Sequence, residues 1–174
     1  MPQDVRNDIV ALLPRLFRFA HALTGSKQEA EDVVQTACER ALTRLDQFTP
    51  GTRLDSWMFR IVRTVAIDRG RRERRSVAVD PVILGEQIVE DARIAEGTAA
   101  RQDLDSVRRA LDELPEQQRS VLLMVALEGL SYQEVADTLG IPIGTVMSRL
   151  SRARRKLAEA VEAGPLAGQK DSDR

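Results

Sequence analysis

The chain has 174 residues, of which 43% are hydrophobic and only 3% are aromatic, and its net charge is −1. A single cysteine and a single histidine exclude an internal disulfide framework and a zinc site of ordinary composition. No apolar run reaches the ~20 residues of a membrane span, and the N-terminus, with Asp4 and Asp8, lacks the apolar core of a signal peptide. We therefore expect a soluble cytoplasmic protein with no membrane insertion of its own, no metal, no cofactor and no catalytic residues.

Residues 1–75 predict three helices that pack as one small domain. Apolar residues at helical spacing form a first helix that ends at a glycine. Ser26 and Glu29 then have the spacing of a capping box, which opens a second helix with one apolar stripe. A proline and a glycine place a loop at 46–55, and a third amphipathic helix follows and runs into the basic segment RGRRERR (69–75).

Residues 76–104 are acidic and lose clear helical periodicity, so we expect a flexible linker there. Helical spacing resumes over 105–162, which predicts a second helical domain. A flexible tail is expected at 163–174. The expected fold class is all-α, with two small helical domains and a helix-turn-helix in the second.

The helix-turn-helix is predicted from a short run of matched features. Ser131 and Glu134 have capping-box spacing at the start of its first helix. Ala136 is small enough for two helices to approach, Gly140 suits the left-handed turn between them, and Val146 faces back onto the first helix.

The second helix of this motif is strongly basic, because residues 143–157 carry five basic side chains and no acidic one. In such a motif the N-terminal half of this helix enters the DNA major groove, and later basic residues contact phosphates. The alternative for a basic run alone is a solvated face of an ordinary bundle helix, but the capped first helix and the glycine turn favour DNA binding. The candidate DNA-binding residues are Thr145, Met147, Ser148, Arg149, Ser151, Arg152, Arg154 and Arg155.

Three segments resemble bacterial sigma factors. The fourth conserved region of these proteins is similar to LDELPEQQRSVLLMVALEGLSYQEVADTLGIPIGTVMSRLSRARRKL (111–157). The second conserved region resembles AEDVVQTACERAL (30–42) followed by LDSWMFRIVRTVAIDRGRRERR (54–75). Only a short connector joins the two regions, an arrangement similar to the extracytoplasmic-function (ECF) group of alternative sigma factors.

The resemblance implies a bacterial protein that directs promoter-specific transcription initiation, in a stress or environmental response, under the control of an anti-sigma factor. Its partners would be the clamp coiled coil of the largest subunit and the flap region of core RNA polymerase, together with promoter DNA. The DNA would be duplex at the −35 element and single-stranded at the −10 element. The residues carried over for core binding are Asp32, Gln35, Thr36, Glu39 and Arg40. Those expected at the −10 element are Arg53, Arg60, Arg63, Thr64, Arg69, Arg71 and Arg72.

Two positions depart from the family pattern. Thr64 stands where many members carry asparagine, which puts an amide contact there in doubt. Met147 stands where many carry a basic residue, which removes a charge and leaves an apolar side chain that could contact a thymine methyl group.

Other interpretations stay open at this point. Trp57 is expected in the core rather than as a stacking platform, and His21 and Cys38 are expected to be structural. A stand-alone helix-turn-helix regulator and an adaptor that binds only proteins are the rival functions. A further hypothesis holds that Glu86, Glu90, Asp91 and Glu96 of the linker mimic nucleic-acid charge along the polymerase.

Overall fold

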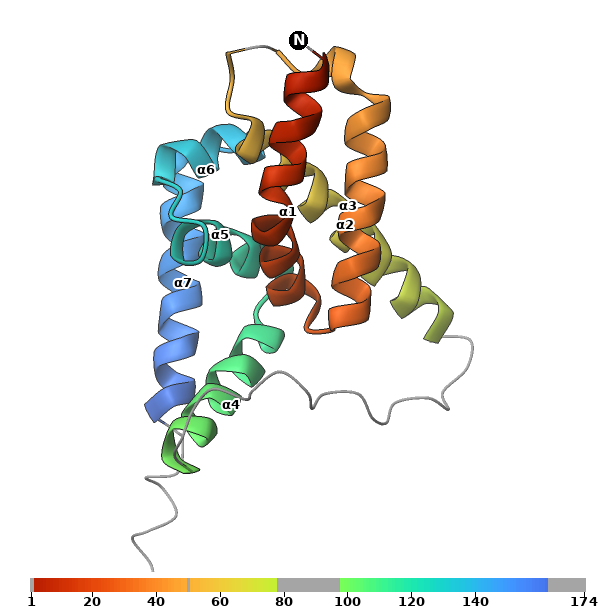
Figure 1. Cartoon of the computed structure of the whole chain (residues 1–174). Helices are drawn as coiled ribbons and strands as arrows, with labels where there is room; N and C mark the ends of the chain where they lie inside the picture. The colour runs from red at the N-terminus through yellow and green to blue at the C-terminus, as the bar shows by residue number, and fades with distance from the viewer. Residues whose placement is uncertain (1, 50, 78–97, 163–174) are drawn as a thin grey trace, which may run out of the picture.

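A computed structural model describes residues 2–49, 51–77 and 98–162. Within these ranges the chain forms only helices, which confirms the all-α fold class (Figure 1). In chain order they are α1 (Pro2–Thr24), α2 (Lys27–Thr43), the 3₁₀ helix η1 (Leu45–Gln47), α3 (Leu54–Val77), α4 (Thr98–Glu113), α5 (Glu116–Ala126), α6 (Tyr132–Leu139) and α7 (Ile143–Glu162). The linker residues 78–97, with the four acidic residues of the charge-mimicry hypothesis, and the tail 163–174 lie outside the described residues.

Helices α1, α2 and α3 form a three-helix bundle around a closed apolar core. Phe19 and Phe59 are completely buried there, and their rings meet edge to face with centroids 5.1 Å apart. Neither residue lies on the apolar stripe that helical spacing predicts for its helix, which includes Leu16, Ala20 and Leu23 in α1 and Met58, Val62 and Val65 in α3. The reason is that each of these helices packs against three others, α1 against α2, α3 and α5, and α3 against α1, α2 and α6. The buried part of each helix surface is therefore wider than one stripe.

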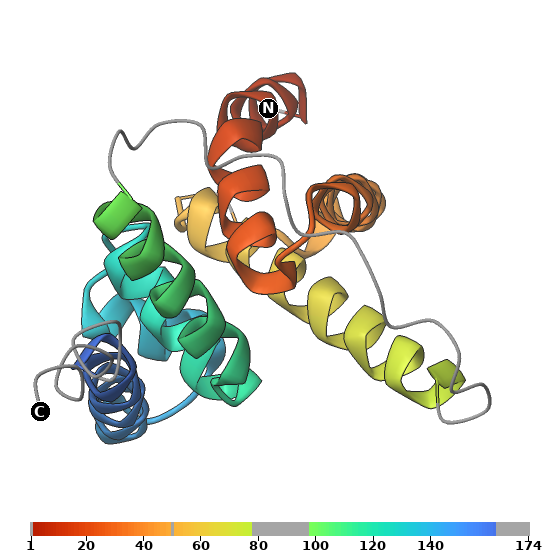
Figure 2. The same ribbon diagram turned by 90° about the horizontal axis from the view of Figure 1, so that it is seen from below.

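The local signals that start and end the N-terminal helices behave as the sequence predicts. The Ser26 hydroxyl caps α2 by accepting a hydrogen bond from the Glu29 amide, and Gly25 adopts a positive φ of 75° between α1 and α2. Helix α3 continues past the bundle, and Figure 2 shows its C-terminal half extending away from α1 and α2.

Helices α4 to α7 form the C-terminal unit, in which α7 packs against α4, α5 and α6. The predicted helix-turn-helix is present as α6, a turn and α7. The Ser131 hydroxyl accepts a hydrogen bond from the Glu134 amide at 3.2 Å, and the Glu134 carboxylate accepts one from the Ser131 amide at 2.7 Å. Gly140 ends α6 in the left-handed conformation, with φ of 63°. The capping box and the glycine turn are therefore confirmed.

The two units pack directly on each other. Helix α5 lies against α1 and helix α6 lies against α3, and one continuous group of buried apolar residues spans both units. Helix α4 begins at Thr98, inside the range 76–104 that the sequence assigned to the linker. In this structure the chain is thus a closed body, with the helix-turn-helix beside the third helix of the N-terminal bundle (Figures 1 and 2).

Candidate DNA-binding and polymerase-binding surfaces

The recognition helix α7 is anchored by one apolar stripe. Val146, Leu150 and Ala153 are buried, because they repeat at three- and four-residue spacing toward the rest of the C-terminal unit. Helical periodicity then separates the candidate DNA-binding residues into three groups. Opposite the buried stripe lie Ser148, Ser151, Arg152 and Arg155, all of them exposed. One flank carries Thr145 and Arg149, and the other carries Met147 and Arg154.

The two flanks of α7 differ in their contacts. Arg149 donates a hydrogen bond to the Gln117 side-chain oxygen at 2.6 Å, at the start of α5. On the other flank Arg154 reaches the Tyr132 hydroxyl at 3.4 Å, and Met147 exposes 53% of its surface. Among the described residues, Arg155 pairs only with Glu159 on its own helix, at a long 3.8 Å, so its guanidinium is accessible to a phosphate.

The residues expected at the −10 element are spread around α3 and the loop before it. Arg60, Thr64 and Arg71 lie on one face of α3 by helical periodicity, and all three are exposed. Arg72 is also exposed, but helical periodicity places it about a quarter of a turn away from this face. Arg69 lies on the opposite side of the helix and forms a 2.8 Å ion pair with Asp32 of α2. The structure therefore brings only part of this set onto one surface.

Arg53 and Arg63 point toward the C-terminal unit. Arg53 forms a two-bond ion pair with Asp55, at 2.7 and 3.0 Å, and also contacts Glu134 of α6. The hydrogen bond from Arg53 is the main cause that lowers the pKa of Asp55. Arg63 donates to Glu116 of α5 at 3.3 Å, and its Nε atom is buried and makes no hydrogen bond to any other described residue.

Burial changes the electrostatics of Arg63. Loss of solvent is the main cause that lowers the pKa of Arg63 below its ordinary value; Glu116 acts in the opposite direction, and the positive charges of Arg149 and Arg71 lower it further. Arg149 and Arg63 therefore lie near each other, although the sequence assigns them to two different promoter elements. An arginine remains charged after such a shift, but it is held away from solvent here.

The residues carried over for core binding lie along α2, and two of them are already paired with α3. Asp32 binds Arg69, and Arg40 forms a 3.4 Å ion pair with Asp68. Gln35 and Glu39 are exposed and share a 3.1 Å hydrogen bond on the outer surface. Thr36 is half-buried.

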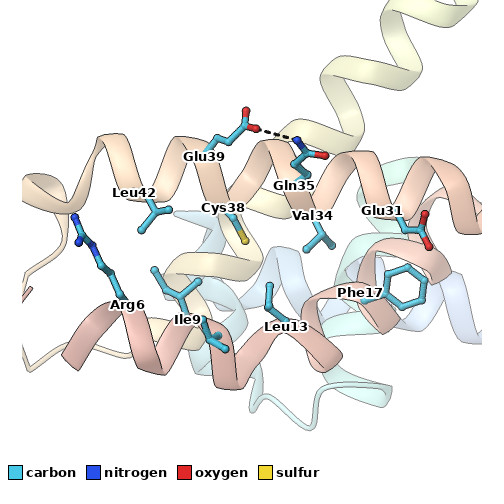
Figure 3. A pocket seen from close by; sticks show the side chains of 11 residues that line it. Arg6, Ile9, Leu13, Phe17, Glu31, Val34, Gln35, Cys38, Glu39 and Leu42 are labelled. Carbon is cyan, nitrogen blue, oxygen red and sulfur yellow. Dashed lines mark hydrogen bonds between the residues drawn. The ribbon is translucent and has the colours of Figure 1, made fainter. Parts of the chain in front are cut away.

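An apolar groove of about 740 Å³ runs between α1 and α2 beside Gln35 and Glu39 (Figure 3). Apolar side chains form most of its lining, and Val10 and Leu42 expose 63% and 44% of their surface. Leu42 falls at the helical spacing of the apolar stripe of α2, with Ala30, Val34 and Ala41, which predicts a buried side chain; this prediction is wrong. Leu42 lies near the end of the bundle, where α1 and α2 leave their outer edge uncovered. The apolar lining residues are Ile9, Val10, Leu13, Phe17, Val34, Cys38 and Leu42.

The residues expected to be structural are all packed against other side chains. Trp57 is half-buried against the core and lies 5.3 Å from the ring of Phe48. His21 stacks on Phe17, with ring centroids 6.1 Å apart. Burial, and secondly the charge of Glu39, raises the pKa of the Cys38 thiol, which disfavours the reactive thiolate.

Two kinds of feature are absent from the described residues. No group of three or more histidine, cysteine or acidic side chains there is placed to hold a metal ion. Among the helices of the described ranges, none combines the length and the apolar character that crossing a bilayer requires.

Three glutamates contribute ion pairs to the contact between the units; the sequence assigned one of them, Glu134, only to the capping box and did not single out the other two. The three are Glu116, Glu128 and Glu134 of the C-terminal unit, and each binds one or more arginines of the N-terminal bundle. Their spacing shows no pattern, so only the three-dimensional packing identifies them as a set.

Known protein families match both halves of the chain. The family described as Sigma-70 region 2 matches residues 9–76, and the family described as Sigma-70, region 4 matches residues 104–157. An ECF RNA polymerase sigma factor, EcfG of Rhodopseudomonas palustris, is 35% identical over 158 residues, which cover 91% of this chain and 85% of the relative. SigW of Bacillus subtilis, also an ECF sigma factor, is 29% identical over 164 residues, covering 89% of this chain and 88% of the relative.

Solved structures agree with these matches. The co-crystal structure of the sigma factor RpoE with the anti-sigma factor NepR from Bartonella quintana is similar to this chain with a TM-score of 0.78 and 30% identity, covering 92% of this chain and 98% of the other. The structure of CnrH in complex with the cytosolic domain of CnrY matches with a TM-score of 0.68 and 25% identity, over 94% of this chain and 90% of the other. With both sigma regions present in order and curated relatives matched over most of their length, the chain belongs to the ECF group of RNA polymerase sigma factors.

Proposed function

We propose that this chain binds core RNA polymerase and directs it to promoters by contacting the −35 element with α7 and the −10 element with α3 and the preceding loop. The observation that carries the proposal is the presence of both sigma regions in one chain, each with an exposed basic surface. The family consists of transcription initiation factors, so RNA synthesis belongs to the polymerase and this chain acts by binding.

At the −35 element, the exposed centre of α7 would face the major groove. Ser148 and Arg152 are placed to reach base edges, because they project from the side opposite the buried stripe. Arg155 would hold a phosphate. Met147 lies on the flank beside Arg154, where its apolar side chain would contact a thymine methyl group.

At the −10 element, the exposed face of α3 would hold the backbone of the separated strand. Arg60 and Arg71 lie on this face with Thr64 between them, and Arg72 extends the positive charge along the helix. Each arginine that binds a phosphate adds a salt-dependent contribution to affinity. Arg69 is assigned a structural role instead, since it joins α3 to α2 through Asp32.

The polymerase-binding surface would combine the polar face of α2 with the apolar groove. A contiguous exposed apolar surface rimmed by polar side chains is typical of protein interfaces. Glu31 and Glu39 rim this groove on the α2 side. An α-helix with an apolar stripe and a basic flank fits these features, and the clamp coiled coil of the largest subunit is our candidate. The C-terminal unit would contact the flap region.

An anti-sigma factor is the remaining proposed partner. The similar sigma factor of Bartonella quintana was crystallised with one. We extend that type of control to this chain, which would then be held inactive until the anti-sigma factor is released.

A gel-shift experiment with and without core polymerase separates this function from its rivals. A sigma factor binds duplex promoter DNA specifically only together with core enzyme, whereas a stand-alone helix-turn-helix regulator binds tightly alone. An adaptor that binds only proteins would form no DNA complex under either condition. Tight, specific binding by the free chain would overturn the proposal, and so would promoter binding unaffected by Arg149→Ala with Arg152→Ala.

A further inference from the structure

Arg149, on one flank of the recognition helix α7, is held by a side chain from another helix of the same unit. Its guanidinium donates a hydrogen bond of 2.6 Å to the side-chain oxygen of Gln117, the second residue of α5. Helices α5 and α7 pack directly against each other, so this bond joins two neighbouring helices. Both partners belong to the C-terminal unit, and the bond needs no residue of the N-terminal bundle.

The partner of Arg149 is a neutral amide, which distinguishes this bond from the ion pairs of the −10 set. Arg53, Arg63 and Arg69 each bind a carboxylate, which offsets their positive charge. A neutral amide oxygen fixes the direction of a guanidinium but leaves its net charge available to an acceptor on DNA. Gln117 thus orients Arg149 without neutralising it.

The hydrogen bond also restricts Arg149 before any DNA is present. A guanidinium has five N–H donors in one plane, and Gln117 accepts from one of its nitrogens, which leaves the other donors for DNA. Ordering a long side chain at an interface weakens binding by a factor of roughly 2 to 12. A side chain that is already ordered in the free protein avoids most of this loss.

Arg149 lies in the part of α7 that is expected to face the bases. Helix α7 begins at Ile143, and the N-terminal half of a recognition helix contacts base edges. A guanidinium in a fixed orientation is suited to two parallel hydrogen bonds with one base, and guanine presents two acceptors on its major-groove edge. Because both bonds must form in one plane, this contact depends on orientation more than a single contact with a phosphate does.

We infer that Gln117 is a positioning residue for −35 recognition, which holds the guanidinium of Arg149 in the orientation that reads one base pair. Gln117 acts through Arg149 and sets how well that base pair is discriminated. The inference rests on the proposed function, because it takes the contact between α7 and the −35 element from it.

The test measures the preference of the holoenzyme among promoters in which each base pair of the −35 element is substituted in turn. Arg149→Ala should lose discrimination at one base pair by about 5- to 150-fold, the range expected for a bidentate contact. Gln117→Met removes the amide but keeps the length of the side chain, and it should lose about two- to tenfold at the same base pair. The double variant should lose no more than Arg149→Ala alone, because Gln117 then has no arginine to orient.

Three further variants complete the experiment. Gln117→Glu keeps an acceptor oxygen for Arg149, so it should retain discrimination at this base pair while its added negative charge lowers the affinity for every promoter. Gln118→Met makes the methionine substitution at the next residue and should keep the natural preference. Gln117 is exposed, so its variants should unfold in urea at the same midpoint as the natural chain, and Gln117→Ala repeats the removal with a second side chain.

The outcomes distinguish this inference from the proposed function. If the natural holoenzyme is specific and folded Gln117→Met and Gln117→Ala keep its full preference, the positioning role is overturned and the proposed function stands. Losses that add in the double variant would also overturn it, since Gln117 would then act independently of Arg149. A natural holoenzyme with no preference among the −35 sequences would contradict the proposed function and, with it, this inference.

Discussion

At the scale of single residues, Met147 is the clearest departure from the basic surface of α7. It is 53% exposed, and it shares its flank with Arg154 rather than with the buried stripe. An exposed methionine in the N-terminal half of a recognition helix makes no obvious contribution to the stability of the fold. Its expected role is a contact with DNA.

Replacing Met147 with arginine should change both promoter preference and salt dependence. The new guanidinium prefers a guanine edge or a phosphate to a thymine methyl group. One added phosphate contact should steepen the slope of the logarithm of the binding constant against the logarithm of the salt concentration by about 0.9. The measurement is binding of the holoenzyme to −35 sequence variants between low and moderate salt. Ala158→Arg adds the same charge at an exposed position farther along α7 and serves as the control, which should keep the natural preference. Unchanged preference and slope in Met147→Arg would show that this side chain faces no DNA.

The contacts of Asp55 predict how the stability of the fold depends on pH. Its hydrogen bonds with Arg53 are the main cause that lowers its pKa in the folded chain, and Arg15 adds a weaker attraction. A lowered folded-state pKa gives stability that is present above the unfolded value of about 3.9 and is lost as the pH falls through the folded value.

Asp55→Asn should therefore reduce the free energy of unfolding by about 1 kcal/mol at pH 7. The difference between the variant and the natural chain should shrink as the pH falls below about 4, because the Asp55 carboxylate is then protonated first in the unfolded chain and, at lower pH, in the folded chain. Urea unfolding at pH 7 and pH 3 measures both values. A difference that stays constant across this range would show that the charge of Asp55 does not stabilise the fold.

At the scale of helices, much of the structure follows from local sequence signals. The capping box of Ser131 and Glu134 and the glycine turn at Gly140 are present as the sequence predicts, because these interactions lie within a few residues of chain. Phe19 and Phe59 were missed because their burial depends on three helices meeting around them. Periodicity along one helix cannot reveal how many neighbours it will have.

Gly140 and Gly144 provide a matched pair for the helix-turn-helix. Gly140 has a φ of 63°, which alanine adopts only with strain, whereas Gly144 lies within α7 at ordinary helical φ with open space around it. Gly140→Ala should destabilise the chain by about 1 kcal/mol. Gly144→Ala should be neutral or stabilising, by up to about 1 kcal/mol. If both substitutions change the free energy of unfolding in urea by the same amount, the left-handed turn does not stabilise the fold.

The groove between α1 and α2 gives a second test at this scale. Leu42→Arg places a charge at an exposed apolar position of the groove and should weaken binding to core polymerase about tenfold, a loss typical of a buried interface contact. Thr43→Arg, on the next residue and outside the groove lining, adds the same charge and should bind normally. Competition with a labelled natural chain for core polymerase measures both affinities. Equal affinity of the two variants would remove the groove from the polymerase-binding surface.

At the scale of the whole molecule, the sequence predicted two helical units in order but not their contact. The apolar stripes and the sigma-like segments identify each unit separately, since their signals are local. The contact combines apolar packing with single charged residues, and Glu128 shows why it could not be foreseen. Glutamates are usually solvent-exposed, and only its position between Arg15 and Arg18 buries this one.

The closed arrangement limits access to both basic surfaces. Each is small, and neither is fully accessible while Glu116 holds Arg63 near Arg149. Under the proposed function, promoter binding by this chain should require further contacts from the polymerase. Promoter recognition is thus a property expected of the holoenzyme rather than of the free chain.

Run-off transcription with purified core polymerase on a library of promoters tests this account most directly. The account predicts transcripts from a subset of promoters sharing −35 and −10 sequences, only when both core enzyme and this chain are present. The double variant Arg149→Ala with Arg152→Ala should lose most of these transcripts while still binding core. The account would be contradicted if the chain produced no promoter-specific transcript with core enzyme, or if the double variant transcribed the same promoters as strongly as the natural chain.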